Sequence, residues 1–146
     1  FGGKWQIVIR LHNRLKKESR SWLNILPSYV SDATFYEDMQ ELLLCTDVGV
    51  TDYSSWIFDY VLSGKPGFII ELNLEDYENA RGFYYPIDTT PFPIAKNSNE
   101  LAENIRNFDA EKYAKDKDVF LAARGCMEDG HASERIVEKI NELMAK

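Results

Sequence analysis

The chain has 146 residues, enough for one domain with a real core, and its 45% hydrophobic and 28% charged content is ordinary for a soluble globular protein. Its 17 basic and 24 acidic side chains leave a formal charge of −7, which argues against nonspecific nucleic-acid binding over the whole surface. Two cysteines, Cys45 and Cys126, are too few for a disulfide framework, and no apolar run approaches the roughly 20 residues that span a bilayer. We therefore expect a cytoplasmic protein with reduced thiols.

The first third of the chain alternates strand and helix patterns. Residues 6–11 form a compact apolar run that predicts a strand, and His12 falls at its carboxyl end. Residues 13–24 suit a partly exposed basic helix or loop. A second strand is predicted at residues 29–31, and residues 36–45 have the apolar stripe of a helix. Because the chain begins with Phe-Gly-Gly-Lys-Trp and leads directly into a strand, we expect a fragment of a larger protein.

A third strand, at residues 48–51, ends abruptly in small hydroxyl and acidic residues. The stretch Thr51-Asp-Tyr-Ser-Ser55 leads from that strand into a helix predicted at residues 56–62. In open parallel sheets, ligands bind beyond the carboxyl ends of the strands, and a helix N-terminus there attracts phosphate. Ser54 and Ser55 are therefore a candidate phosphate site. From spacing alone, the simpler interpretation is that the two serines cap the helix.

The rest of the chain continues the same alternation and then becomes helical. Residues 67–70 form the near-continuous apolar run of a parallel strand that is covered on both faces. Residues 72–96 lose periodicity and predict a long aromatic-rich loop, of a length that is frequently functional. Three further helices are predicted, at residues 98–107, at 111–124 and after the turn at 129–133. Four short strands with intervening helices predict a doubly wound α/β fold with a helical C-terminal tail, as a single domain over residues 1–146.

Several segments, taken in order, resemble a known family. They are Ile9-Arg-Leu-His12, Asp38-Met-Gln-Glu-Leu-Leu-Leu-Cys-Thr-Asp47, Val48-Gly-Val-Thr-Asp-Tyr-Ser-Ser-Trp-Ile-Phe-Asp59, Lys65-Pro66, Arg81-Gly-Phe-Tyr84 and Gly130-His-Ala-Ser-Glu-Arg135. This series resembles the CDP-glycerol glycerophosphotransferase family of wall teichoic acid and capsule synthesis. The resemblance covers nearly the whole chain, and its most specific part is Thr-Asp-Tyr-Ser-Ser followed shortly by Phe-Asp.

The resemblance implies a two-domain GT-B architecture, in which this chain is the C-terminal, Rossmann-like, nucleotide-binding half. The family transfers glycerol phosphate from CDP-glycerol to a poly(glycerol phosphate) or linkage-unit acceptor and releases CMP, and relatives transfer ribitol phosphate. A Trp-His-Gly-Thr-Pro-like motif of the family is absent from these 146 residues, so the fragment alone is expected to be inactive without its own N-terminal domain. A location in the cytoplasm, with peripheral contact to the inner face of the membrane, is implied as well.

The resemblance also assigns roles to the candidate site residues. Ser54 and Ser55 would hold the pyrophosphate of the donor. His12 is expected to be catalytic, either as the general base or as a ligand of a phosphate oxygen, and which histidine moves the proton stays open. Arg81 is expected to bind phosphate through its planar fork, and Arg14 to compensate donor charge. Surface solvation is the alternative for Arg14, and an ion pair with a nearby acid is the alternative for Arg81.

The remaining candidates support the site instead of carrying the chemistry. Asp52 is expected to bind donor by orienting the serines or the ribose, although it could equally accept amides of its own turn. Thr51, Asp59 and Gly82 are expected to support the arrangement. The acidic residues lack the oxygen spacing of a calcium loop, so we expect no metal site and no required cofactor, with a divalent ion on the donor left open. His131 is interpreted as a turn and cap residue.

Two other interpretations compete with this one. A GT-B domain that uses another sugar nucleotide, as a glycosyltransferase or an epimerase, would have the same fold. A noncatalytic receiver domain also has a hydroxyl after one strand and a Lys-Pro after another, which Thr51 or Ser54 and Lys65-Pro66 would mimic. A receiver needs an acidic pair after its first strand, however, and this chain has His12 and Asn13 there. Glycerol versus ribitol phosphate, priming versus polymerisation, the acceptor and the oligomeric state stay open.

Overall fold

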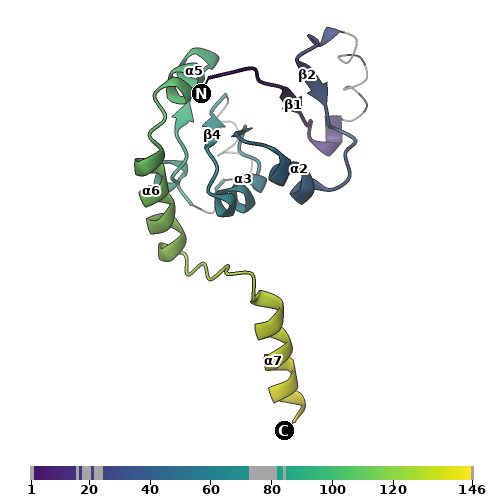
Figure 1. The fold of residues 1–146 in the computed structure, drawn as a ribbon, viewed down its shortest axis with the longest axis vertical. Helices are drawn as coiled ribbons and strands as arrows, with labels where there is room; N and C mark the ends of the chain where they lie inside the picture. Colours follow the sequence, from purple (N-terminus) through teal and green to yellow (C-terminus); the bar gives the residue numbers. More distant parts are fainter. Residues whose placement is uncertain are drawn as a thin grey trace. The chain divides into compact units, whose positions relative to one another are not determined.

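The computed structural model describes residues 2–15, 17, 21, 25–72, 82–83 and 85–145, and Figure 1 labels its elements along the chain. The chain divides into two compact units, residues 1–47 and 48–146, and each is described by itself. That residues 1–146 form one domain stays a prediction.

The first unit is built on two short parallel strands. Its elements are β1 (Ile7–Ile9), the 3-10 helix η1 (Asn13–Leu15), β2 (Val30–Asp32) and α2 (Met39–Cys45). β1 and β2 pair in parallel, with Ile7 opposite Val30. α2 begins three residues later than predicted, because the Asp38 side chain accepts a hydrogen bond from the Glu41 amide at 2.9 Å and so fixes the start of the helix.

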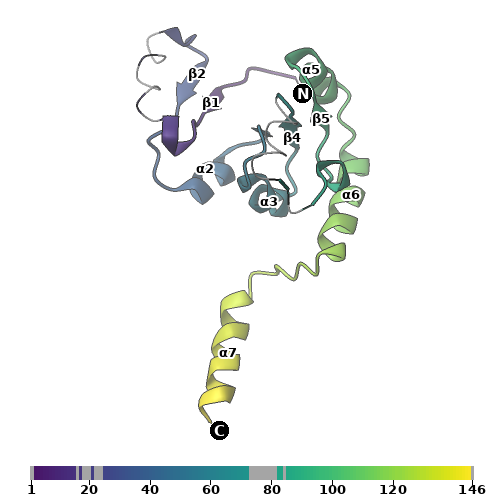
Figure 2. The same ribbon diagram turned by 180° about the vertical axis from the view of Figure 1, so that it is seen from behind.

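The second unit contains a three-stranded parallel sheet. Its elements are β3 (Gly49–Thr51), α3 (Trp56–Tyr60), the 3-10 helices η3 (Val61–Ser63) and η4 (Ile87–Thr89), β4 (Gly67–Ile70), β5 (Ile94–Ala95), α5 (Ser98–Arg106), α6 (Ala110–Ala123) and α7 (Ala132–Met144). The strand order is β3-β4-β5, with Gly49 opposite Gly67 and Ile69 opposite Ile94. Figure 2 shows β5 beside β4. Every strand pair in the described part of the chain is parallel, as the α/β prediction requires.

Helix ends in the second unit follow local sequence signals. The Asn97 side chain accepts hydrogen bonds from the amides of Asn99 and Glu100, both at 3.0 Å, which starts α5 as predicted. Glu100 reaches back to the Lys96 amide at 2.8 Å, one residue further than in the usual capping box. Gly64 adopts a left-handed conformation with φ of 71° and ends η3, which confirms the predicted glycine stop.

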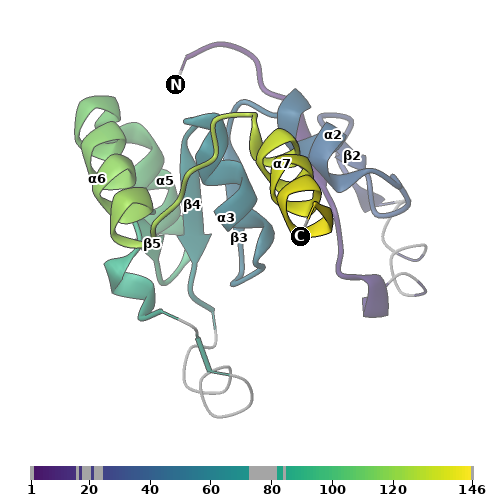
Figure 3. The same cartoon turned by 90° about the horizontal axis from the view of Figure 1, so that it is seen from below.

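Two glycines allow aromatic side chains to pack closely on the sheet. A Cβ on Gly49 would lie 2.8 Å from Cε1 of Tyr60 in α3, and one on Gly67 would lie 3.0 Å from Phe92. Figure 3 shows β4 between α3 and the pair of α5 and α6. The buried core cluster consists of Ile57, Val61, Ile69, Phe92 and Tyr113. This packing fixes the strand that leads into the predicted site, because Gly49 precedes Thr51 by two residues.

Two parts of the second unit differ from the sequence prediction. β5 lies in the stretch that was predicted to be a loop, and it is joined to α5 where the Asn104 side chain donates a hydrogen bond to the Ile94 carbonyl at 2.9 Å. α7 has an apolar stripe as predicted, but no residue of α7 is buried. The side chains of Ile136, Ile140 and Leu143 are 59%, 49% and 60% exposed.

The core predicts a pH dependence of stability. Tyr113 is 5% exposed, and burial raises the pKa of its hydroxyl to about 12, against a smaller opposing effect of the Gly67 backbone. The pKa of a tyrosine hydroxyl in the unfolded chain is about 10. Above that pH the unfolded state therefore binds fewer protons than the native state, and stability falls as the pH rises. We expect thermal unfolding from about pH 9 to about pH 12 to show a falling melting temperature.

The variant Tyr113→Phe should lose this part of the pH dependence and should keep its melting temperature at neutral pH. Its hydroxyl makes no hydrogen bond with the described residues, so little is lost with it. Tyr29→Phe, at a side chain that is 55% exposed, is the matched control and should keep the wild-type profile. An alkaline profile that is the same in Tyr113→Phe and in wild type would contradict the assignment.

Candidate functional site

The turn after β3, residues 51–55, is held by its own backbone and one buried hydroxyl. Thr51 is 4% exposed, and its Oγ1 accepts a hydrogen bond from the Ser54 amide at 3.0 Å. Tyr53 has φ of 78°, a left-handed conformation that is uncommon for a residue with a side chain. The turn leaves the side chains of Asp52, Ser54 and Ser55 exposed beyond the carboxyl end of β3. Thr51 therefore stabilises the turn, and its supporting role in a donor site stays a prediction.

The two serines are not used as helix caps. Ser55 occupies the N-cap position of α3, but its side chain makes no capping hydrogen bond, and the Ser54 amide is already bound by Thr51. The capping interpretation that spacing alone favoured is therefore wrong for the side chain of Ser55. Because α3 has only five residues, its summed dipole is small, and the predicted phosphate contact would depend mainly on the two exposed hydroxyls.

The two acidic candidates of the second unit are both exposed. Asp52 lies in the turn, and Asp59 lies within α3. Neither side chain makes a hydrogen bond or an ion pair within the described residues. Asp52 therefore does not accept amides of its own turn there, which was the alternative to a ligand-binding role.

The carboxyl end of β1, in the first unit, is fixed by the turn that follows β2. The Leu11 amide donates a hydrogen bond to Oγ1 of the fully buried Thr34 at 3.1 Å, and the Thr34 amide donates to the Asp32 side chain at 2.8 Å. The Arg10 guanidinium donates to the Tyr36 carbonyl at 2.6 Å. Sequence reasoning missed Thr34, although an Asp-x-Thr pattern directly after a strand is typical of a turn stabilised by side chains.

His12 and Arg14 lie together just beyond this fixed strand end. Both side chains are exposed, and the Arg14 amide donates a hydrogen bond to Nδ1 of His12 at 3.2 Å. A neutral imidazole whose Nδ1 accepts a hydrogen bond has its proton on Nε2. In this arrangement Nε2 is a donor, which suits a ligand of a phosphate oxygen better than a general base. The Arg10 side chain is bound to the Tyr36 carbonyl, whereas the Arg14 side chain is exposed. That Arg14 binds the nucleotide donor stays a prediction.

Residues 82–83 belong to an aromatic-rich stretch, called the aromatic segment below, that contacts the turn at residues 51–55 in the second unit. Arg81 lies outside the described residues, so its predicted phosphate contact stays a prediction. The next residue, Gly82, is exposed and has φ of 68°, a conformation that favours glycine. The ring of Phe83 packs against that of Tyr53 with 5.5 Å between centroids. The structure therefore brings the Gly82–Phe83 stretch to the serine-bearing turn, within one unit.

The structure brings the predicted residues together in two groups. His12 and Arg14 form one group in the first unit, while Thr51, Asp52, Ser54 and Ser55 form the other with Gly82. That both groups act on one donor stays a prediction.

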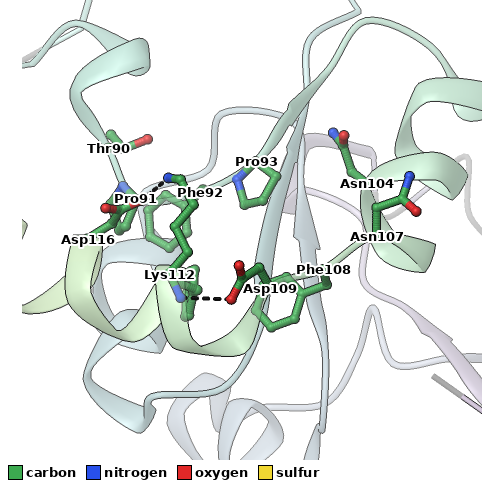
Figure 4. Close-up of a pocket in the computed structure, with 11 residues that line it drawn as sticks. Thr90, Pro91, Phe92, Pro93, Asn104, Asn107, Phe108, Asp109, Lys112 and Asp116 are labelled. Carbon is green, nitrogen blue, oxygen red and sulfur yellow. Dashed lines mark hydrogen bonds and ion pairs between the residues drawn. The ribbon is translucent and has the colours of Figure 1, made fainter.

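A cavity of about 320 Å³ in the second unit lies away from the serine turn of that unit. Figure 4 shows it between the stretch 90–93, the end of α5 and the start of α6, where the Lys112 amide donates to the Asp109 side chain at 2.9 Å. Residues 90–93 precede β5, whereas the serine turn follows β3. In a parallel sheet these positions lie at opposite edges, and no predicted site residue that the structure describes lines the cavity.

His131 has a structural environment, as the sequence suggested. It lies at the N-cap of α7, and its Nδ1 is 3.0 Å from the Glu134 carboxylate. The Arg135 guanidinium donates two hydrogen bonds to Asp129, at 2.7 and 2.8 Å, and lowers the pKa of that carboxyl below its usual range. These contacts organise the start of α7.

The described part of the chain has neither a metal-binding cluster nor a membrane-spanning helix. No group of three or more His, Cys, Asp and Glu side chains there is arranged to hold a metal ion. No helix among those residues has the length and apolar character required to cross a membrane.

The comparisons with known proteins agree on one family. Residues 1–142 match the family described as CDP-Glycerol:Poly(glycerophosphate) glycerophosphotransferase, and the chain belongs to this family. A teichoic acid poly(ribitol-phosphate) polymerase of Bacillus spizizenii is 37% identical over 90% of this chain and 23% of its own length. A teichoic acid glycerol-phosphate transferase of Staphylococcus aureus is 35% identical over 77% of this chain and 30% of its own length.

A solved structure agrees with the fold. The wall teichoic acid polymerase TagF superimposes with a TM-score of 0.74 at 30% identity, over 94% of this chain and 34% of that protein. A histidine variant of TagF soaked with CDPG gives a TM-score of 0.73 at 29% identity. These matches confirm the predicted α/β, GT-B-like fold and argue against a receiver domain. The chain spans about a third or less of the length of these relatives.

Proposed function

We propose that this chain binds the donor CDP-glycerol in a larger transferase, which passes glycerol phosphate to a teichoic-acid-like or capsular polymer and releases CMP. The observation that carries the proposal is the pair of exposed serine hydroxyls, Ser54 and Ser55, which the described structure does not use and which lie at the carboxyl end of a parallel strand. Membership of the family supports the reaction, and the soak of TagF with CDPG supports the donor.

The residues fit the demands of this transfer. An acceptor hydroxyl attacks the phosphorus of the glycerol phosphate group, the bond from that phosphorus to the CMP oxygen breaks, and the hydroxyl proton passes to a base. Ser54 and Ser55 would donate hydrogen bonds to the pyrophosphate. His12, with its proton on Nε2, and the exposed Arg14 would stabilise the charge that develops on the phosphate oxygens.

The same proposal covers the partners and the setting of the enzyme. The acceptor polymer and an N-terminal domain of the same enzyme would complete the site. Work on the cytoplasmic side, with peripheral contact to the inner face of the membrane, would give access both to a soluble nucleotide donor and to a membrane-borne acceptor. CDP-glycerol enters as a substrate, and no resident cofactor is required in this proposal.

CDP-ribitol is a second candidate donor. The relative of 37% identity is a poly(ribitol-phosphate) polymerase, which is a specific reason to test ribitol phosphate beside glycerol phosphate. The two donors share the cytidine and the pyrophosphate and differ in the polyol. The serine turn would therefore serve either donor equally, and selection between them would come from other contacts.

Calorimetric titration of the chain tests donor binding directly. CDP-glycerol, CDP-ribitol, CDP and a UDP-sugar would each be titrated with and without Mg²⁺. Heat with the cytidine compounds and none with the UDP-sugar is the expected result. Binding of the UDP-sugar alone would support the other GT-B interpretation, and a strict requirement for Mg²⁺ would contradict the metal-free proposal.

Removal of a serine hydroxyl should weaken donor binding. For Ser55→Ala we expect about tenfold weaker CDP-glycerol binding, since one hydrogen bond to a charged group is worth about 1.5 kcal/mol or more. The melting temperature should stay close to that of wild type, because the side chain is exposed and makes no hydrogen bond there. Ser98→Ala, at another exposed serine at a helix start, is the matched control and should bind normally. Equal affinity in all three proteins would assign Ser55 no role in binding.

A further inference from the structure

Arg124, directly after α6, makes an unusual set of contacts. Its guanidinium carbon lies 4.3 Å from the ring centroid of Tyr85 and 3.8 Å from that of Phe120. Its Nη2 donates a hydrogen bond to Oγ1 of Thr89 at 3.3 Å, and its Nη1 donates to the Phe120 carbonyl at 3.3 Å. One side chain thus attaches α6 to two points of the segment that leads into β5.

The same segment is attached to the serine turn at its other end. Phe83 packs on Tyr53, the left-handed residue between Thr51 and Ser54. Phe83 therefore attaches this stretch to the serine turn, while Tyr85 and Thr89 attach it to the end of α6.

The Arg124 guanidinium contacts aromatic rings instead of acidic side chains. The chain carries 24 acidic side chains, yet Arg124 forms no ion pair with the described residues, and its Nε is buried without a hydrogen-bond partner there. The guanidinium is therefore held by the two rings and not by a carboxylate. A cation over an aromatic ring is attracted by the negative face of the ring. Lysine has no planar group to stack on the rings, so it is a poor substitute.

We propose that Arg124 is a positioning residue for donor binding, which fixes the aromatic segment so that Gly82 and Phe83 are in place at the serine turn before the donor arrives. This inference rests on the proposed function of that turn. Without the Arg124 contacts, the aromatic segment would have to become ordered when the donor binds. The entropic cost of that ordering would weaken the affinity for the donor. The chemical step, which Arg124 does not touch, would be unchanged.

Steady-state kinetics of the full-length transferase test the role. For Arg124→Ala we expect the KM for the donor to rise about tenfold while kcat stays within about twofold of wild type. Arg124→Lys should resemble the alanine variant, and Tyr85→Phe, which keeps a ring, should resemble wild type. Arg106→Ala, at an exposed arginine of α5, is the control and should change neither constant. An unchanged KM in Arg124→Ala, with or without a lower kcat, or full rescue by lysine, would overturn the proposal.

Hydrogen exchange of donor-free protein separates this inference from the proposed function. The amides of Thr89 and Thr90, which donate to the carbonyls of Pro86 and Ile87, should exchange faster in Arg124→Ala than in wild type and in Arg106→Ala. Unchanged exchange, with donor binding intact in wild type, would overturn the positioning role alone. Absence of binding of any cytidine donor to wild type would overturn both the proposed function and the donor-positioning role, whatever the exchange shows.

Discussion

His12→Ala lowers turnover of the full-length transferase by about 100-fold or more and leaves CDP-glycerol affinity within about threefold of wild type. The reason is the position of the imidazole after β1, where the Arg14 amide bonds to Nδ1 and directs the Nε2 proton outward. A contact that strengthens as charge develops on the phosphate oxygens contributes to kcat more than to binding. Radiolabelled glycerol phosphate transfer and calorimetry of the same preparations measure the two quantities.

The second histidine of the chain supplies the control for this experiment. His131→Ala should retain wild-type turnover, because His131 contacts only the start of α7 among the described residues. His12→Gln separates the two roles left open for His12, since the amide can donate from a similar position but cannot take up a proton. Partial activity in the glutamine variant supports a role of His12 as a hydrogen-bond donor to phosphate, whereas activity as low as in His12→Ala supports a role as the general base. Full turnover in His12→Ala would remove His12 from the mechanism.

Gly49→Val destabilises the second unit by about 2 kcal/mol or more and weakens donor binding with it. A Cβ on Gly49 would lie 2.8 and 2.9 Å from ring atoms of Tyr60 and 3.0 Å from the Trp56 ring, and Tyr60 is only 1% exposed. The buried tyrosine has no free space to move into, so the helix that follows the serine turn must shift. Urea unfolding of wild type and variant measures the loss of stability.

Gly49→Ala completes this series, because a single methyl group should produce a smaller loss in the same direction. Gly2→Ala is the control, since a Cβ there meets nothing within 4 Å and its backbone requires no left-handed conformation. It should unfold at the wild-type urea concentration. Wild-type stability in Gly49→Val would show that the contact between β3 and α3 is looser than this structure has it.

Apolar patterns predicted both buried and exposed elements, among them β4 and α7. Residues 67–70 coincide with β4, and the start of α5 was readable from Asn97 and Glu100, because capping depends on neighbours in sequence. β5 was missed, since two residues cannot show an alternation. The start of α2 was set by Asp38, which a stripe of apolar residues does not reveal.

The candidate site was predicted only in part, for a similar reason. His12 and the serine turn were found because they follow strand patterns and match family segments. The contacts that position them join residues distant in sequence: Leu11 with Thr34, Tyr53 with Phe83, and Tyr85 with Arg124. Such pairs follow from tertiary packing, and a single sequence carries no pattern that reports them. The capping role that spacing favoured for the Ser55 side chain was wrong, because the Ile57 and Phe58 amides, which such a cap would bind, donate to the carbonyls of Ser54 and Ser55.

Gly49 and Gly67 lie directly opposite each other in the paired strands β3 and β4. Side chains at paired positions of neighbouring strands point to the same face, so both missing side chains leave room on that face of the sheet. Tyr60 from α3 lies against Gly49, and Phe92 from the stretch before β5 lies against Gly67. The height of α3 above the sheet, and with it the position of Ser55 at the start of that helix, therefore depends on a backbone position that carries no side chain.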